Sequence, residues 1–240
     1  ALKVHNKPLG MISFNYVLAN IEEPLVALRE ASDRLTNEGV ISIVTGYHPK
    51  QFQNNRFDYI NHDHVSYFTY RDLASMMKKL NLTIEYCRLS EIKGGSIHII
   101  ARKISGNKSQ KETKSFISEL FDNPAIVFEM KDRVERERDK LNKLLTSTHN
   151  IFGVGASINT THLINEFRIG QNLQFLVDDD SSKWGKFSPK FGLEVASFER
   201  VSNSRGVCII LAWQHAASLL TRLKEVGFRG EIIVPLPELV

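Results

Sequence analysis

The stretch IFGVGASINTTHLINEFRIGQNLQFLVDDD, residues 151–180, carries the clearest fold signal in the chain. It opens with a short apolar run, continues with a helical pattern over 160–167, and returns to an apolar run over 173–177. Strand, helix and strand at this spacing predict a parallel sheet. Further strands are expected at 207–212 and 231–234, with a helix over 216–226 between them. The sequence therefore predicts an α/β domain over residues 149–240.

The N-terminal part shows the same alternation. Residues 9–17 and 40–44 are mostly apolar, which is typical of strands buried on both faces. Between them a helix is expected to begin at Pro24, because proline suits the first helical position. Apolar residues continue at helical spacing as far as Leu35, and Gly39 is expected to end the helix.

Two more strands and a helix complete the first 104 residues. Residues 69–72 read TYRD, a pattern that resembles a capping box at a helix start. Strands are expected at 83–89 and 96–102, separated by Gly94-Gly95. A strand pair so close in sequence suggests an antiparallel edge on a mostly parallel sheet.

Residues 105–148 are expected to link the two α/β parts. Residues 104–116 are polar, as in a surface loop. Asn123-Pro124 is then expected to open a long charged helix with one apolar stripe. The stripe consists of Ile126, Met130, Val134, Leu141 and Leu145. The predicted organisation is 1–104, a linker at 105–148, and 149–240.

Composition narrows the classes of function. The 240 residues include 31 Lys and Arg and 27 Asp and Glu, a net charge of +4 without a basic run, so no nucleic-acid partner is expected. Two cysteines are too few for a disulfide framework or a cysteine-based zinc site. No apolar stretch suits a membrane span or signal peptide. We expect a cytoplasmic protein without a membrane partner.

The densest group of chemically active side chains is Asn61-His62-Asp63-His64. Imidazole titrates near neutral pH and a carboxylate can orient it, so the group favours proton transfer. Two histidines two residues apart could also share a metal with His48, or all could be surface residues. No further motif supports a metal, and none is assigned.

Two glycine motifs have a structural and a functional interpretation. Gly94-Gly95-Ser96 could let the backbone approach a ligand closely, or could simply form a turn. Gly153-Val154-Gly155 begins like a dinucleotide fingerprint, with Asp178 near the position of a ribose-binding acid. The third glycine position is Ile158, however. An NAD-dependent oxidoreductase is therefore an alternative function, and a structural turn is the simpler interpretation.

The segment FDYINHDHVSYF, residues 57–68, resembles the F-D-x-I-Y-H-E-H-L-S-Y-F signature of S-adenosylmethionine-dependent sugar C-methyltransferases. Other segments of the chain resemble motifs of that family in the same order. They are NYVLANI (15–21), GGS (94–96), GVGA (153–156), LAW (211–213) and VPLPEL (234–239). The resemblance covers essentially the whole chain.

This resemblance implies a fold. The first part would be the second half of a Rossmann-like class I methyltransferase sheet, joined by a helical linker to a second Rossmann-like α/β domain. The family's N-terminal zinc region and Gly-rich S-adenosylmethionine loop have no counterpart in these residues. We therefore expect the C-terminal portion of a longer enzyme, whose cofactor site is completed by a further N-terminal segment or a partner chain. Asn15 and Asn20 are the implied cofactor-binding residues.

It also implies a reaction. A methyl group would pass from S-adenosylmethionine to the carbon beside the ketone of a nucleotide-linked sugar, after a base removes the acidic proton. By position His64 would be the base, with Asp63 and His62 orienting or stabilising it. The residues implied for the sugar pocket are Asn61, Tyr67, Gly94, Gly95 and Ser96.

The chain departs from the family pattern at several positions. Asn61 replaces a tyrosine and Asp63 a glutamate. In the C-terminal motif the usual Pro, Lys and Gly are Ser157, Asn159 and Thr160, which removes a possible phosphate contact. The substitutions at Asn61 and Asp63, together with the absence of the cofactor loop from these residues, favour an alternative, a non-catalytic module that binds a nucleotide-sugar or a partner chain.

Overall fold

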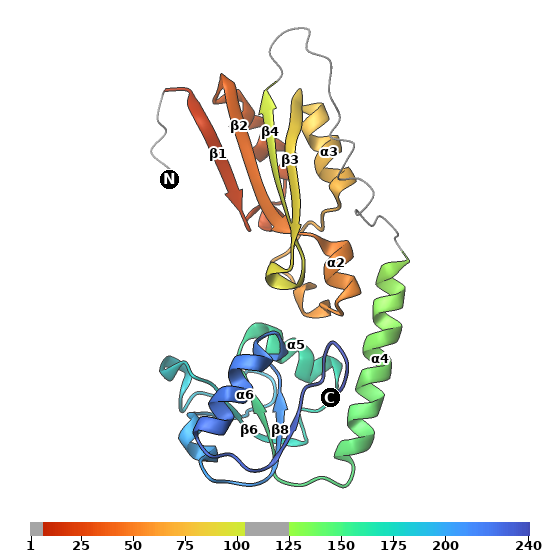
Figure 1. Ribbon diagram of the computed structural model, residues 1–240, viewed down its shortest axis with the longest axis vertical. Coiled ribbons are helices and arrows are strands. Elements are labelled where there is room, and N and C mark those ends of the chain that lie inside the picture. The colour runs from red at the N-terminus through yellow and green to blue at the C-terminus, as the bar shows by residue number, and fades with distance from the viewer. Residues whose placement is uncertain (1–6, 104–124) are drawn as a thin grey trace. The chain divides into compact units, whose positions relative to one another are not determined.

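The computed structural model describes residues 7–103 and 125–240 (Figure 1). The chain divides into two compact units, Ala1–Val127 and Phe128–Val240. The predictions for the polar stretch at 104–116 and for Asn123-Pro124 lie outside the described residues.

The first unit contains a four-stranded sheet in the order β1-β2-β4-β3. Its strands are β1 (Leu9–Asn15), β2 (Leu35–Gly46), β3 (Leu82–Ser90) and β4 (Ser96–Lys103). β1 and β2 are parallel, whereas β4 is antiparallel to both of its neighbours. The predicted antiparallel pair is confirmed, and β4 is inserted between β2 and β3. This insertion brings the loop before β4 close to the end of β2.

Three α-helices accompany this sheet: α1 (Pro24–Asp33), α2 (His48–Gln53) and α3 (Tyr70–Lys79). Short 3₁₀ turns cover Leu18–Asn20, Phe57–Tyr59 and Ile92–Gly94. α3 begins at the predicted capping box, in which Thr69 and Asp72 exchange hydrogen bonds with each other's backbone. This box satisfies amide groups that the first helical turn leaves without partners.

The predicted end of the first helix at Gly39 is wrong. α1 ends at Asp33, and Gly39 lies inside β2. Leu35 is buried and pairs with Leu9 of β1, and the register shifts before Met11 pairs with Val40. Pairing with a distant strand therefore overrides the local helical spacing, and an irregularity in the ladder accommodates the extra residues.

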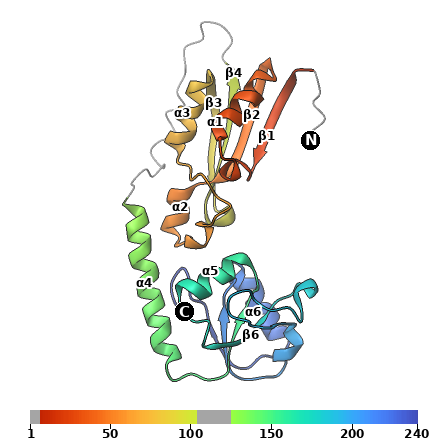
Figure 2. The same ribbon diagram turned by 180° about the vertical axis from the view of Figure 1, so that it is seen from behind.

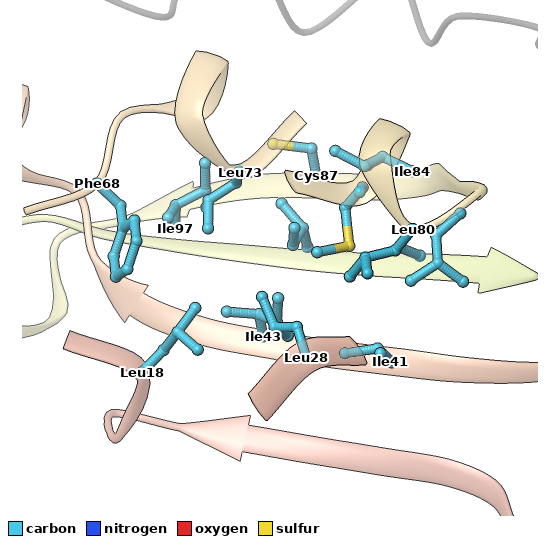
Figure 3. Close-up of a cluster of buried hydrophobic side chains, with 14 of the residues drawn as sticks. Leu18, Leu28, Ile41, Ile43, Phe68, Leu73, Leu80, Ile84, Cys87 and Ile97 are labelled. Carbon is cyan, nitrogen blue, oxygen red and sulfur yellow. The ribbon is translucent and has the colours of Figure 1, made fainter. Parts of the chain in front are cut away.

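The core of the first unit lies between the sheet and its helices (Figure 3). Leu28 of α1 and Leu73 of α3 pack in the same cluster as Ile41 and Ile43 of β2. Ile41 and Ile43 share a face because side chains alternate along a strand. The shared cluster fixes both helices to the sheet.

The sheet of the second unit is parallel, as predicted. It has five strands in the order β7-β6-β5-β8-β9. Figure 2 shows this unit, in which the colour runs from green to blue. The strands are β5 (Ile151–Val154), β6 (Leu173–Val177), β7 (Val195–Ala196), β8 (Val207–Ile210) and β9 (Glu231–Ile233). Its helices are α5 (Ile158–Glu166) and α6 (Ala216–Glu225), with 3₁₀ turns at Ser181–Lys183, Phe198–Val201 and Trp213–His215. The chain is thus α/β throughout, with two Rossmann-like sheets.

The long charged helix is α4 (Ile126–Leu145). All five residues of its predicted apolar stripe are buried. Asn142 donates a hydrogen bond to the Phe167 carbonyl at 2.8 Å, and Glu137 accepts one from the Leu239 amide at 3.0 Å. These contacts attach α4 to the second unit.

Candidate active site

A small pocket lies where β1 and β2 end, and we call it the His64 pocket. Its volume is about 50 Å³. It is lined by Tyr16, Ala19, Asn20, Thr45, Gly46, His48, Gln51, Tyr59, His64 and Lys93. Sites that enclose a small molecule usually have volumes of about 300–1,000 Å³, so this pocket admits one functional group of a ligand rather than a whole nucleotide-sugar. Carboxyl ends of parallel strands are the usual ligand sites of α/β sheets.

The segment that carries His64 is fixed to the turn after β1. The amides of Val65 and Ser66 both donate to the Ala19 carbonyl, at 2.9 and 3.1 Å. A few residues later the Phe68 amide donates to Nδ1 of His48 at 3.0 Å. These bonds place His64 at the pocket although its segment has neither helix nor strand.

The hydrogen bonding of His64 defines its tautomer. Nδ1 lies 2.8 Å from the Tyr59 carbonyl oxygen. A carbonyl can only accept, so Nδ1 carries the proton, and Nε2 of the neutral ring holds a lone pair. The Tyr59 and His64 rings are stacked, with centroids 6.1 Å apart and planes 9° apart. The arrangement orients an imidazole whose second nitrogen can accept a proton.

The other polar residues of the histidine motif lie outside the pocket. The side chains of His62 and Asp63 are 80% and 57% exposed and contact each other at 3.3 Å. Asn61 accepts a hydrogen bond from the Asp63 amide within its own turn. Tyr67 packs edge-on against His48, with ring centroids 4.7 Å apart. Of the predicted catalytic residues, only His64 lines the pocket.

The two predicted cofactor residues are placed differently. Asn15 ends β1, is exposed, and pairs with Val44 in the sheet. Asn20 is also exposed but lines the His64 pocket.

Gly94 and Gly95 are required by packing. Both have positive φ values, +75° and +138°. A Cβ on Gly94 would lie 2.7 Å from Arg56, and one on Gly95 would lie 2.9 Å from Lys50. The loop therefore packs directly against α2 and the residues after it, and only glycine fits there.

His48 is a buried, neutral histidine. Burial lowers its pKa to about 4, and the nearby His64 acts in the same direction. The Phe68 amide donates to Nδ1, which must therefore lack a proton. His48 thus orders the loop and is not available as a base at neutral pH.

This burial predicts a pH-dependent stability. The unfolded chain protonates His48 below about pH 6.5, whereas the folded chain does so only near pH 4, so stability falls as the pH drops through this window. The expected loss is about 3 kcal/mol. Urea denaturation across this range should show it. In His48→Asn, whose amide oxygen can accept from Phe68, most of the slope should vanish.

The matched exchange His62→Asn alters an exposed histidine and should leave the pH dependence as in the wild type. An unchanged slope in His48→Asn would contradict the assignment.

A larger pocket, about 470 Å³, lies in the second unit where β5, β6 and β8 end. It is lined by Gly155, Ala156, Ser157, Ile158, Asn159, Thr160, Asp178, Lys183, Leu211, Ala212, Gln214 and His215. Asp178 accepts a hydrogen bond from the Ala156 amide at 2.8 Å and pairs with Lys183 at 3.1 Å. The volume lies within the usual range of small-molecule sites.

The glycines of this turn serve strand packing. A Cβ on Gly153 would lie 2.3 Å from Leu211, and one on Gly155 would lie 2.7 Å from Ala212. Ile158, at the third position of the dinucleotide pattern, is 53% exposed and begins α5. Close packing of β5 against the end of β8 therefore accounts for the Gly-x-Gly sequence.

Within residues 7–103 and 125–240, no three His, Cys, Asp or Glu side chains gather as ligands of a metal would. Over the same ranges, no helix combines the length and apolar character needed to cross a membrane.

Comparison with known proteins identifies related sequences. Residues 91–237 match the C-methyltransferase C-terminal domain, and residues 2–86 match a methyltransferase domain. The chain is 25% identical to the C-methyltransferase NovU of Streptomyces niveus, over 92% of this chain and 55% of that protein. It thus spans about half the length of this relative.

A solved structure from Bacillus halodurans, of a protein assigned as a methyltransferase, is 12% identical with a TM-score of 0.37. The match covers 44% of this chain and 68% of that one.

Proposed function

Because the chain belongs to the C-methyltransferase C-terminal domain family, we propose that it acts in methyl transfer from S-adenosylmethionine to a carbon beside the ketone of a nucleotide-linked sugar. One observation carries the proposal. His64 lines a pocket at the carboxyl ends of β1 and β2, with Nδ1 committed to the Tyr59 carbonyl and Nε2 left to accept a proton. The comparisons do not support the alternative of an NAD-dependent oxidoreductase.

The chemistry follows from the position of the base. Nε2 of His64 takes the proton on the carbon beside the ketone, and the C–H electron pair forms a carbon–carbon double bond. The carbonyl π pair moves to oxygen, which gives an enolate. A positioned general base contributes about 10² to 10⁴ in rate. The carbon of the enolate is then the nucleophile in methyl transfer.

S-adenosylmethionine, when bound, supplies the electrophilic methyl group. The residues at the end of β1 fit such a molecule in their chemistry, since Asn15 and Asn20 are exposed amides that can both donate and accept hydrogen bonds. We propose these two residues as its contacts from this chain.

A cytoplasmic setting for this activity is part of the proposal. Cys87 and Cys208 are buried free thiols, and burial raises the pKa of the Cys87 thiol to about 11. Unpaired buried cysteines are usual in a reducing compartment.

A second candidate function is a non-catalytic module that binds a nucleotide-sugar. The pocket of the second unit favours it, because its volume of about 470 Å³ suits a nucleotide better than the His64 pocket does. Asp178 at the end of β6 is placed to accept a hydrogen bond from a sugar hydroxyl. Binding without proton exchange would distinguish this module from the enzyme.

Calorimetric titration tests the proposal. The 240-residue chain is titrated with S-adenosylmethionine and, separately, with a panel of thymidine-diphosphate sugars. We expect binding of a sugar nucleotide and no binding of the cofactor by this chain alone. Tight cofactor binding would show that the chain holds a complete site. Absence of binding in both titrations would contradict the proposed substrate class.

A further inference from the structure

Lys93 presents a cation at the His64 pocket. Its Nζ lies 3.7 Å from the centroid of the Tyr16 ring, and both residues line the pocket. Both also have left-handed backbones, with φ of +54° at Lys93 and +50° at Tyr16. Such a conformation costs about 1–3 kcal/mol in a residue other than glycine and is concentrated at functional sites. Two residues in this conformation therefore meet at one pocket.

The backbone that carries Lys93 is held firmly. Gln51, a buried residue of α2, donates through Nε2 to the Lys93 carbonyl at 3.1 Å. Asn54 donates to the next carbonyl, that of Gly94, at 3.0 Å. Because these bonds fix the loop at the base of the side chain, Lys93 reaches the pocket from a preorganised position.

The hydroxyl proton of Tyr16 is already used in a hydrogen bond to Ser96. Ser96 has one hydroxyl proton and gives it to the Ile92 carbonyl at 2.7 Å. The Tyr16 hydroxyl, 2.9 Å from Ser96 Oγ, must therefore donate its own proton to Ser96. The Tyr16 hydroxyl is therefore not free to donate to a ligand, and the face of its ring contacts the Lys93 ammonium.

Two other groups of the pocket cannot take the place of the Lys93 cation. His48 is neutral, and the Gln51 Oε1 is an acceptor that lacks a hydrogen-bond partner in the described residues. An acceptor cannot stabilise developing negative charge. Of the described residues that line the pocket, only Lys93 has an ammonium side chain.

We propose that the Lys93 ammonium binds the substrate oxygen that becomes negative when His64 removes the neighbouring proton. This inference rests on the proposed function and adds a catalytic residue to it. The ammonium stabilises the oxygen by charge and hydrogen bonding, and no proton needs to leave it. A preorganised donor at a developing oxyanion is worth about 10² to 10³ in rate.

The rate of proton exchange with solvent measures how strongly Lys93 stabilises the negative oxygen. The probe is dTDP-4-keto-6-deoxyglucose in D₂O, and proton NMR follows the loss of signal at the carbons beside the ketone. Lys93→Gln should exchange about 10²-fold more slowly than the wild type. Lys93→Arg should retain most of the rate, because it keeps the charge. Lys79→Gln, an exposed lysine of α3, should match the wild type. Equal rates in Lys93→Gln and the wild type would overturn the assignment.

A second measurement separates this inference from the proposed function. Oxalate, a planar dianion that resembles an enolate, is titrated into the same variants and followed by NMR. The wild type, Lys93→Arg and Lys79→Gln should bind it, and Lys93→Gln should not. If the wild type exchanges no ketosugar protons, the proposed function is wrong. Oxalate binding then tests by itself whether the Lys93 ammonium binds an anionic oxygen. Wild-type chain that does not bind oxalate, or Lys93→Gln that does, would overturn the inference.

Discussion

Alanine in place of His64 is expected to abolish exchange of the ketosugar proton with solvent. Nε2 of His64 is the proposed base, and its loss should lower the rate by about 10² to 10⁴. His48 cannot replace it, because burial lowers its pKa to about 4 and its Nδ1 accepts the Phe68 amide. Deuterium incorporation into dTDP-4-keto-6-deoxyglucose, followed by proton NMR, gives the rate.

Two histidine controls define the specificity of this effect. His149→Ala changes an exposed residue of the second unit and should leave exchange unaltered. His62→Ala removes the neighbour in the motif, which is exposed and does not line the pocket. It should retain most of the rate. Normal exchange in His64→Ala would remove this residue as the base, and a strong loss in His62→Ala would restore His62 to the site.

Removal of the Asp58 carboxylate is expected to cost about 3–5 kcal/mol of stability. Arg56 and Asp58 form a two-bond ion pair, at 2.9 and 3.1 Å, whose side chains are only 3% and 1% exposed. Asp58→Ala leaves the guanidinium buried without its carboxylate. Urea denaturation at neutral pH, compared with the wild type, measures the loss.

The ion pair also supports the site. The Arg56 guanidinium lies 4.1 Å from the centroid of the Tyr59 ring, and Tyr59 holds Nδ1 of His64. Asp58→Ala is therefore expected to slow proton exchange in the fraction that remains folded. The double variant Arg56→Met, Asp58→Ala should be less destabilised than the single variant, because no unpaired charge remains.

An exposed ion pair provides the matched control. Arg102 and Glu85 are also bonded, at 2.8 Å, but their side chains are 37% and 45% exposed. Glu85→Ala should cost less than about 1 kcal/mol, since water already screens the pair. Equal losses in Asp58→Ala and Glu85→Ala would show that burial does not determine the effect.

Most elements of secondary structure were predictable from local pattern. The strand expected at 173–177 is β6 with the same bounds, and the apolar stripe of α4 is buried at each predicted position. A buried strand such as β6 is a short apolar run, and a helix such as α4 buries one stripe of apolar residues. The spacing of apolar residues in the sequence therefore predicts both kinds of element. The first helix shows where local pattern fails. Leu35 fits the helical spacing, but its pairing with Leu9 draws it into β2.

The site divides in the same way. The motif at residues 57–68 identified His64 as the candidate base, because all residues of that motif are contiguous in the sequence. By position in the motif His64 was the expected base, but the motif also gave orienting roles to His62 and Asp63, which are exposed and do not line the pocket. The bond from Nδ1 to the Tyr59 carbonyl makes that distinction. No pattern in the sequence predicts such a bond, because it depends on how the loop folds back on itself.

The sequence by itself was sufficient for the α/β class, the order of most strands and helices, and His64 as a candidate base. Only the tertiary structure brought Tyr16, Gln51 and Lys93 to the same pocket. These residues come from three separate segments, and they meet because β4 is inserted between β2 and β3 in the sheet. The order of the strands within the sheet and the packing of the loops depend on long-range contacts. The periodicity of apolar residues reports only the environment of each segment along its own length.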